Sequence, residues 1–180
     1  MRTRHAILVV LLLAAVAAVL FWPTPRRRAI EKLESVNGIY IEEPDYDGRM
    51  LSIVSMMGQP ATNDDLMLLR DIRPIHRLLL DGTKVTDAGL VHLEGIEELE
   101  WVSVCKTQVT DEGMSHLARI RTLRYLHVRD TQISDAGLAR FHGMPRLEQV
   151  NVISSRVTSA GVEELRRTTP TVTHVAQFLN

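Results

Sequence analysis

Val85-Thr86-Asp87-Ala88-Gly89-Leu90 is a short motif that returns three times along the chain. The later copies start at Val109, Ile133 and Val157, so each step is 24 residues. One step backward, residues 61–66 form a degenerate copy that lacks the glycine. A fixed period of this length is the signature of a repeat protein. We therefore divide residues 61–180 into five units, 61–84, 85–108, 109–132, 133–156 and 157–180.

Apolar residues occupy fixed positions in each unit and predict one strand and one helix. The strand columns are Ile75, Leu99, Leu123 and Leu147; Leu78, Val102, Leu126 and Val150; and Leu80, Val104, Val128 and Val152. The helix columns are Leu66, Leu90, Met114, Leu138 and Val162, followed three residues later by Leu69, Leu93, Leu117, Phe141 and Leu165. Alternation is typical of a half-buried strand, and a spacing of three is typical of one helix face. Because one unit cannot bury its apolar side alone, we expect an α/β solenoid of stacked parallel strands.

The run Leu99-x-x-Val102-x-Val104-x-x-Thr107-x-Val109-Thr110-Asp111-x-Gly113 resembles the leucine-rich repeat. It is similar to the 24-residue Thr-x-Val-Thr-Asp-Ala-Gly-Leu variety of planctomycete-type bacteria. The resemblance covers residues 61–180 and implies a short horseshoe with its parallel strands on the concave side. Leucine-rich-repeat relatives also imply a protein partner, although that step rests on the fold alone.

Hydroxyl, acidic and glycine columns accompany the apolar ones. Thr83, Thr107, Thr131 and Ser155 stand where many such repeats carry Asn, and we expect their hydroxyls to satisfy backbone groups of the bend. A row formed by Asp87, Asp111 and Asp135 would suggest metal binding, but a Thr-Asp pair before an apolar helix face is typical of a helix N-cap. Gly89, Gly113, Gly137 and Gly161 then mark tight helix starts, where a side chain would crowd the neighbouring unit. No metal site and no cofactor are predicted.

Residues 29–60 predict an N-terminal cap made of a helix and a hairpin. The helix carries Ala29, Ile30 and Leu33 on one face and ends at Asn37-Gly38. Strands are expected at 39–41 and 50–56, joined by the acidic turn 42–48. One period before the first strand columns lie Leu51, Val54 and Met56, which we therefore expect to face inward. At the other end, Thr168-Thr169-Pro170 interrupts the pattern and leaves the register of residues 171–180 open, with a polar last strand expected at 171–174.

Residues 1–28 predict an N-terminal membrane anchor with a basic flank. The apolar run 6–22 has 17 residues and lies between two arginines and the Arg26-Arg27-Arg28 cluster. As a single transmembrane helix it would be roughly 26 Å long, near the lower limit for crossing a bilayer. A cleaved signal peptide ending near Ala15-Val16-Ala17 is the alternative. We favour a single-pass protein of a bacterial inner membrane with its repeats outside the cytoplasm.

Charge and cysteine content exclude several functions. Five of the 21 basic residues precede Ala29, so 16 of them face all 22 acidic residues in the remainder. This excess of negative charge argues against nucleic acid, whose phosphates are bound by Lys and Arg. Cys105 is the only cysteine, which rules out an internal disulfide and a cysteine-based zinc site.

Outward-facing strand positions form the candidate binding surface. Three rows are expected: Arg77, Trp101, Tyr125 and Gln149; Leu79, Ser103, His127 and Asn151; and Asp81, Cys105, Arg129 and Ile153. Trp101 beside Tyr125, flanked by Arg77 and Arg129, has the composition of an interface hot spot. The alternative is an ordinary surface with Arg77 stacked on Trp101. The candidate partner-binding residues are Arg77, Trp101, Tyr125, His127, Arg129 and Asn151.

Ser103 or Cys105 beside His127 suggests a nucleophile and a base, but the pattern places no carboxylate next to His127 and no loop to form a pocket. We therefore expect no enzyme and no catalytic residue. The predicted function is membrane-tethered, non-enzymatic protein–protein recognition through the concave face. The alternative is a structural spacer or assembly element without a specific ligand.

Overall fold

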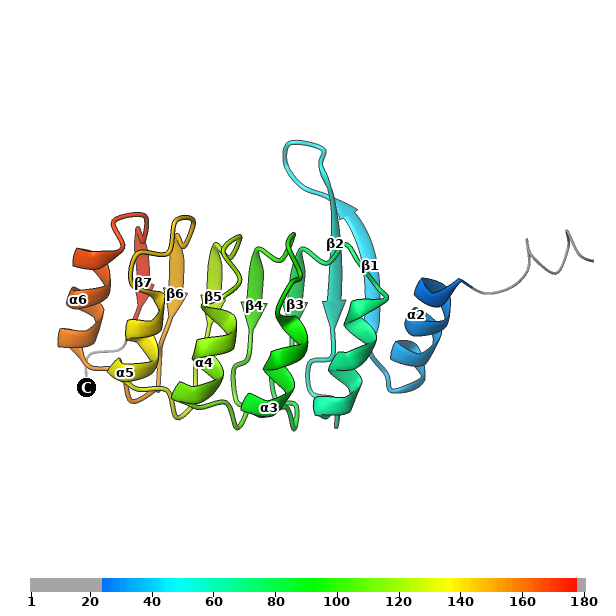
Figure 1. Cartoon of the computed structure of the whole chain (residues 1–180), viewed down its shortest axis with the longest axis horizontal. Coiled ribbons are helices and arrows are strands. Elements are labelled where there is room, and N and C mark those ends of the chain that lie inside the picture. Colours follow the sequence, from blue (N-terminus) through cyan, green and yellow to red (C-terminus); the bar gives the residue numbers. More distant parts are fainter. Residues whose placement is uncertain (1–23, 178–180) are drawn as a thin grey trace, which may run out of the picture.

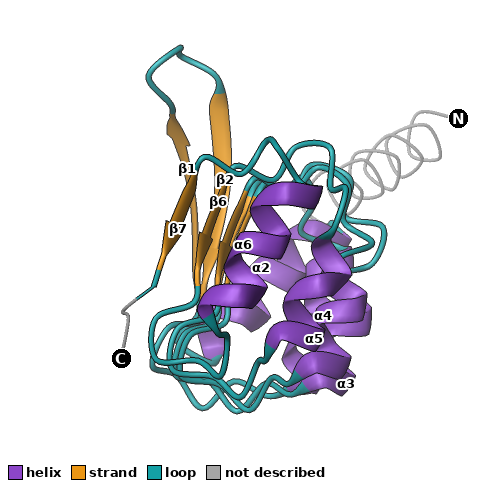
Figure 2. Cartoon of the chain, turned by 90° about the vertical axis from the view of Figure 1, so that its left-hand side faces the viewer, coloured by secondary structure: helices purple, strands orange, loops and turns teal. Residues whose placement is uncertain are grey.

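A computed structural model describes residues 24–177 of the chain. Helices cover one side of a seven-stranded sheet and leave the other side bare (Figures 1 and 2). The strands follow one another in chain order, β1 to β7. No helix of residues 24–177 is long and apolar enough to span a membrane. The anchor predicted at residues 6–22 lies outside the described residues.

Each repeat unit contributes one short strand and one helical segment. β1 (Ile39–Pro44) pairs with β2 (Met50–Ser55) in antiparallel fashion, and all later neighbours are parallel. The other strands are β3 (Arg77–Leu79), β4 (Trp101–Ser103), β5 (Tyr125–His127), β6 (Gln149–Asn151) and β7 (His174–Ala176). The helical segments are α2 (Pro25–Ser35), η1 (Asn63–Arg70), α3 (Asp87–Leu90), η2 (Val91–Leu93), α4 (Asp111–Leu117), α5 (Asp135–Leu138), η3 (Ala139–Phe141) and α6 (Ser159–Thr168). This arrangement is the predicted leucine-rich-repeat solenoid.

The core lies between the sheet and the helical layer. Leu78, Val102, Leu126 and Val150 pair in register across four strands and are buried. The helical columns are buried as well, including Phe141, which is one of the largest fully buried side chains. Both predicted apolar faces are therefore confirmed, and their burial is the main driving force for stacking the units.

Hydroxyl side chains fix the bend that follows each strand. Thr107 donates its hydroxyl to the carbonyl oxygen of Val104 at 2.6 Å, and Thr83 donates to Leu80 at 2.7 Å. Thr131 and Ser155 make the same bond to Val128 and Val152. The predicted hydroxyl column is confirmed, because each of the first four units satisfies one bend carbonyl in this way.

The recurring aspartates join consecutive units rather than capping their own helices. Thr110 and Ser134 are the N-cap residues of α4 and α5. Asp111, the first residue of α4, accepts hydrogen bonds from the backbone nitrogen of Ser134 at 2.8 Å and from its hydroxyl at 2.5 Å. Asp87 binds Thr110 and Asp135 binds Thr158 in the same way. The Thr-Asp pair does mark the helix N-cap as predicted, but the capping side chain is the hydroxyl residue, and the aspartate binds the next unit.

The hydrogen bonds from each aspartate to the next unit, called the aspartate ladder here, also explain the glycine column. A Cβ atom added at Gly137 would collide with the carboxylate of Asp111, and one added at Gly113 would collide with that of Asp87. The crowding predicted for the glycine column is confirmed, and its source is the aspartate of the preceding unit, or Asn63 in the case of Gly89.

Structure and prediction differ at the N-terminal end. α2 starts at Pro25, inside the segment assigned to the anchor flank, and Asn37 ends the turn after it with a φ of 59°. Val54 and Met56 are buried in the core cluster as predicted, whereas Leu51 is buried but lies outside that cluster. β2 already begins at Met50, so strict alternation from Val54 places Leu51 on the bare side of the sheet. In the other units, the residue equivalent to Leu51 precedes the strand.

The last unit contains one extra residue. β7 pairs with β6 through Gln149 and His174, a step of 25 positions instead of 24. The strand predicted at residues 171–174 was therefore placed too early. Thr169, at the interruption, is buried and donates its hydroxyl to the carbonyl oxygen of Phe141 at 3.1 Å. This contact fixes the end of α6 before the chain enters β7.

Candidate functional site

The side of the sheet without helices, called the strand face here, carries an aromatic stack. Trp101 and Tyr125 are cross-strand partners, with ring centroids 4.9 Å apart and planes inclined by 30°. His127 meets Trp101 edge-on at 4.9 Å. The guanidinium of Arg77 lies over Trp101, 5.6 Å from the ring centroid. All four residues are half-buried, because they cover one another.

The other two candidates are held apart from this stack. Arg129 follows β5 and forms an ion pair with Asp130 at 3.1 Å. Asn151 pairs with His127 in register, but its side-chain oxygen accepts a hydrogen bond from the Ile153 nitrogen at 3.2 Å. The cation over Tyr125 is Arg124, 5.3 Å from the ring centroid. Arg124 thus takes the flanking position expected for Arg129.

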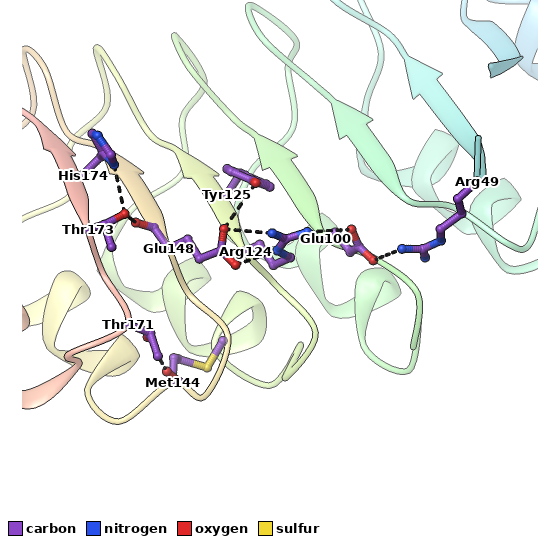
Figure 3. A network of polar contacts seen from close by, with 9 residues as sticks. All are labelled: Arg49, Glu100, Arg124, Tyr125, Met144, Glu148, Thr171, Thr173 and His174. Carbon is purple, nitrogen blue, oxygen red and sulfur yellow. Dashed lines mark hydrogen bonds and ion pairs between the residues drawn. The ribbon is translucent and has the colours of Figure 1, made fainter. Parts of the chain in front are cut away.

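A row of charged residues runs beside the stack, at the amino ends of the strands (Figure 3). Arg124 binds both carboxylate oxygens of Glu148 at 2.9 Å, and Tyr125 donates its hydroxyl to Glu148 at 3.3 Å. Glu100 bridges Arg49 at 2.7 Å and Arg124 at 3.8 Å. This network holds Tyr125 in place beside Trp101. The hydrogen bonds from Arg124 are the main reason why the pKa of Glu148 is lowered.

Sequence reasoning missed this row although its signal is simple. His76, Glu100, Arg124 and Glu148 stand one period apart, immediately before their strands. His76 is buried and accepts a hydrogen bond from the Ser52 nitrogen at 3.0 Å, and burial lowers its pKa. The alternating charges of the next three residues would have predicted ion pairs between neighbouring units.

The hairpin β1–β2 extends beyond the other strands and forms an arm at one end of the row (Figure 1). Its turn, residues 45–48, borders a groove of about 390 Å³ on the strand face. The groove is lined by Asp45, Tyr46, Asp47, Arg49, Leu51, His76, Arg77, Glu100, Trp101, Arg124 and Tyr125. The arm and the aromatic stack therefore form the two sides of one site.

The strand face also brings Asp81, Ser103, Cys105 and His127 together. Ser103 is buried and donates its hydroxyl to Asp81, which also accepts a bond from the Cys105 nitrogen at 2.9 Å. Burial lowers the pKa of His127, and the charge of Asp81 opposes that shift, although Asp81 forms no ion pair with the imidazole among the described residues. The geometry is nevertheless unlike a catalytic triad, because the serine hydroxyl points to the acid instead of to the imidazole.

The Cys105 thiol of this cluster is half-buried. Burial raises the pKa of Cys105, which disfavours the reactive thiolate. Across residues 24–177, no group of three or more His, Cys, Asp or Glu residues could hold a metal ion. What the strand face offers is a rigid surface of rings, guanidinium groups and carboxylates.

Comparison with known proteins identifies similar solved structures. No protein-family model and no curated protein matches it. Among solved structures it is similar to a leucine-rich-repeat protein of Leptospira interrogans, at 15% identity and a TM-score of 0.43. That match covers 60% of this chain and only 27% of the Leptospira chain.

With two further similar structures, the match covers most of both chains. One is the leucine-rich-repeat ectodomain of the receptor kinase SOBIR1 from Arabidopsis thaliana, at 11% identity, with 86% of this chain and 91% of that chain covered and a TM-score of 0.48. The other is internalin C2 from Listeria monocytogenes, at 13% identity, with 89% and 96% covered and a TM-score of 0.34. The leucine-rich-repeat fold itself follows from the strand register and the stacking described above.

Proposed function

We propose that this chain is a protein-recognition module that binds a protein partner through its strand face. The observation that carries the proposal is the stack of Arg77, Trp101 and Tyr125 on the side of the sheet that the helices leave bare. Large rigid side chains of this kind supply most of the binding energy in protein interfaces. His127, Arg129 and Asn151 are proposed to contribute at the margin of the contact.

The stack is ordered before any partner arrives. Tyr125 is fixed by Glu148 and by Trp101, so little side-chain freedom remains to be lost on binding. Trp101 Nε1 and His127 Nε2 are buried and have no hydrogen-bond partner among residues 24–177, so a partner would contact the rings and not these atoms.

Replacing Trp101 and Tyr125 with Ala tests this proposal. Each substitution is expected to weaken partner capture by at least about 1 to 2 kcal/mol, since a central ring and its buried area are lost. Pull-down of the intact, membrane-inserted protein followed by quantitation of the captured partner measures the effect. Glu97→Ala and Glu98→Ala, at exposed positions between η2 and β4, are the controls and should leave capture unchanged.

Capture that survives loss of both rings but fails after changes on the helical side would contradict the strand-face proposal. The structural alternative, a spacer without a specific ligand, has its own support in Arg77, which already covers one face of Trp101. If the chain is such a spacer, no partner is captured, and neither the ring substitutions nor the changes on the helical side alter that result.

We further propose that residues 6–22 tether the module to a bacterial inner membrane, with the repeats outside the cytoplasm. The support is the 17-residue apolar run followed by Arg26, Arg27 and Arg28. The full-length chain is expected to stay in the membrane fraction after an alkaline carbonate wash. A mature protein that begins near Ala18 and appears in the soluble fraction would show a cleaved signal peptide instead.

We also propose that α2 and the β1–β2 hairpin cap the N-terminal end of the solenoid. Ala29 and Leu33 of α2 are buried in the same core as the repeat columns. Without them, the apolar side of the first unit would meet water.

A further inference from the structure

We propose that the groove between the arm and the aromatic stack receives a lysine- or arginine-bearing segment of the protein partner. This inference rests on the strand-face function proposed above and names the chemistry of its partner. Three observations support it: two aspartates of the groove form no ion pair within the described chain, aromatic rings line the same groove, and hydrogen bonds order the turn of the arm.

The guanidinium groups of the groove are already matched by carboxylates of the same chain. Arg49 is paired with Glu100 at 2.7 Å, Arg124 with Glu148 at 2.9 Å and Arg77 with Glu43 at 3.7 Å. An acidic partner would have to displace these glutamates to reach the three arginines. The arginines therefore leave little net attraction for an anion.

Asp45 and Asp47 are the groove carboxylates left without a cation. Neither forms an ion pair with another residue of the described chain, and Asp47 is exposed. The site thus carries a negative charge that the chain itself does not neutralise. A cationic side chain of a partner would complete the charge balance, and the same field would speed its approach.

Aromatic rings line the same groove as these aspartates. Tyr46, at the tip of the arm between Asp45 and Asp47, is fully exposed, and Trp101 and Tyr125 line the groove from the strand face. Lys and Arg side chains combine an apolar stem with a charged head. The stem can pack against a ring while the head reaches the aspartates, and the cation gains further from a nearby ring face.

The arm holds its carboxylates in place. The side chain of Asp45 accepts hydrogen bonds from the backbone nitrogens of Asp47 at 3.0 Å and of Arg49 at 2.9 Å. The backbone of Asp45 is bonded to that of Arg49 across the turn, at 2.9 Å. Because the turn is already ordered, binding a cation there needs little rearrangement.

A fluorescence titration with charged peptides tests the proposal. Trp101 becomes the only tryptophan when Trp22 is replaced by Phe in the full chain, held in nanodiscs of uncharged lipid. Hexalysine is expected to change Trp101 emission in a saturable way that weakens as salt is added, and hexaglutamate is not. Asp45→Asn with Asp47→Asn keeps the shape of the turn and should weaken hexalysine binding about three- to tenfold, the effect of losing two exposed ion pairs.

Asp64→Asn in η1 with Glu163→Gln in α6 removes the same charge from exposed positions of the helical side and should leave hexalysine binding unchanged. Equal binding of the two peptides, or equal losses in the two double variants, would overturn the assignment of a basic segment. If partner capture still required Trp101 and Tyr125 in that case, the strand-face function would stand and only the partner chemistry would be wrong. If capture did not require the rings, the function itself would be wrong.

Discussion

Leu126→Ala is expected to lower the free energy of unfolding by about 2 to 5 kcal/mol. Leu126 lies in β5, in the middle of the sheet, and is completely buried between Val102 and Val150 of the neighbouring strands. Each unit makes its contacts with the units beside it, so a cavity at this position weakens two interfaces at once. Urea denaturation followed by circular dichroism measures the loss.

Leu79→Ala is the matched control, because the same side chain is truncated on the opposite side of a strand. Leu79 lies on the strand face and is only half-buried. Its replacement should cost far less than that of Leu126, since less apolar surface returns to water. Equal losses at the two sites would mean that the inward and outward faces have been exchanged.

The period of the sequence was sufficient to predict the core and the rows of the strand face. A position that repeats every 24 residues has the same environment in each unit, so Leu78, Val102, Leu126 and Val150 could be assigned together. The same reasoning placed Trp101 beside Tyr125. It worked because burial depends on the alternation within a strand, which short-range sequence shows directly.

Periodicity does not reveal which unit supplies a hydrogen-bond partner. Asp111 could have capped its own helix or bound the next unit, and both arrangements repeat with the same spacing. The structure selects Ser134, which lies 23 residues further along the chain. Similarly, Leu51 matched the apolar column by position but not by direction, because β2 begins earlier than the strands of the later units.

The groove could not be predicted from the repeat at all. Its arm belongs to the hairpin before the first unit, and Tyr46 lines the same groove as Trp101 only because the sheet brings β2 and β4 within two strand spacings. The sequence predicted an acidic turn at residues 42–48, but it gave no indication of what that turn would face. Contacts between the end of a solenoid and its repeats require the three-dimensional structure.

A second large effect on the free energy of unfolding is expected at the aspartate ladder. Asp111→Ala should lower the free energy of unfolding by about 2 to 4 kcal/mol, because the nitrogen and the hydroxyl of Ser134 both lose a charged acceptor. Ser159→Ala is the control. Ser159 holds the equivalent first helical position of the last unit, is exposed, and makes no such contact among the described residues. Its replacement should change stability by less than about 0.5 kcal/mol.

Gly137→Ala should also destabilise, by about 1 to 3 kcal/mol, because its new methyl group would collide with the Asp111 carboxylate. The two substitutions are therefore coupled. Once Asp111 is Ala, the obstructing carboxylate is gone, and Gly137→Ala should add little further loss. A double-mutant cycle by urea denaturation measures the coupling, which should exceed about 0.5 kcal/mol for groups in direct contact. Strictly additive losses would show that another contact, such as that of the new methyl group with the Ile133 side chain at 3.1 Å, requires the glycine and not the carboxylate of the preceding unit.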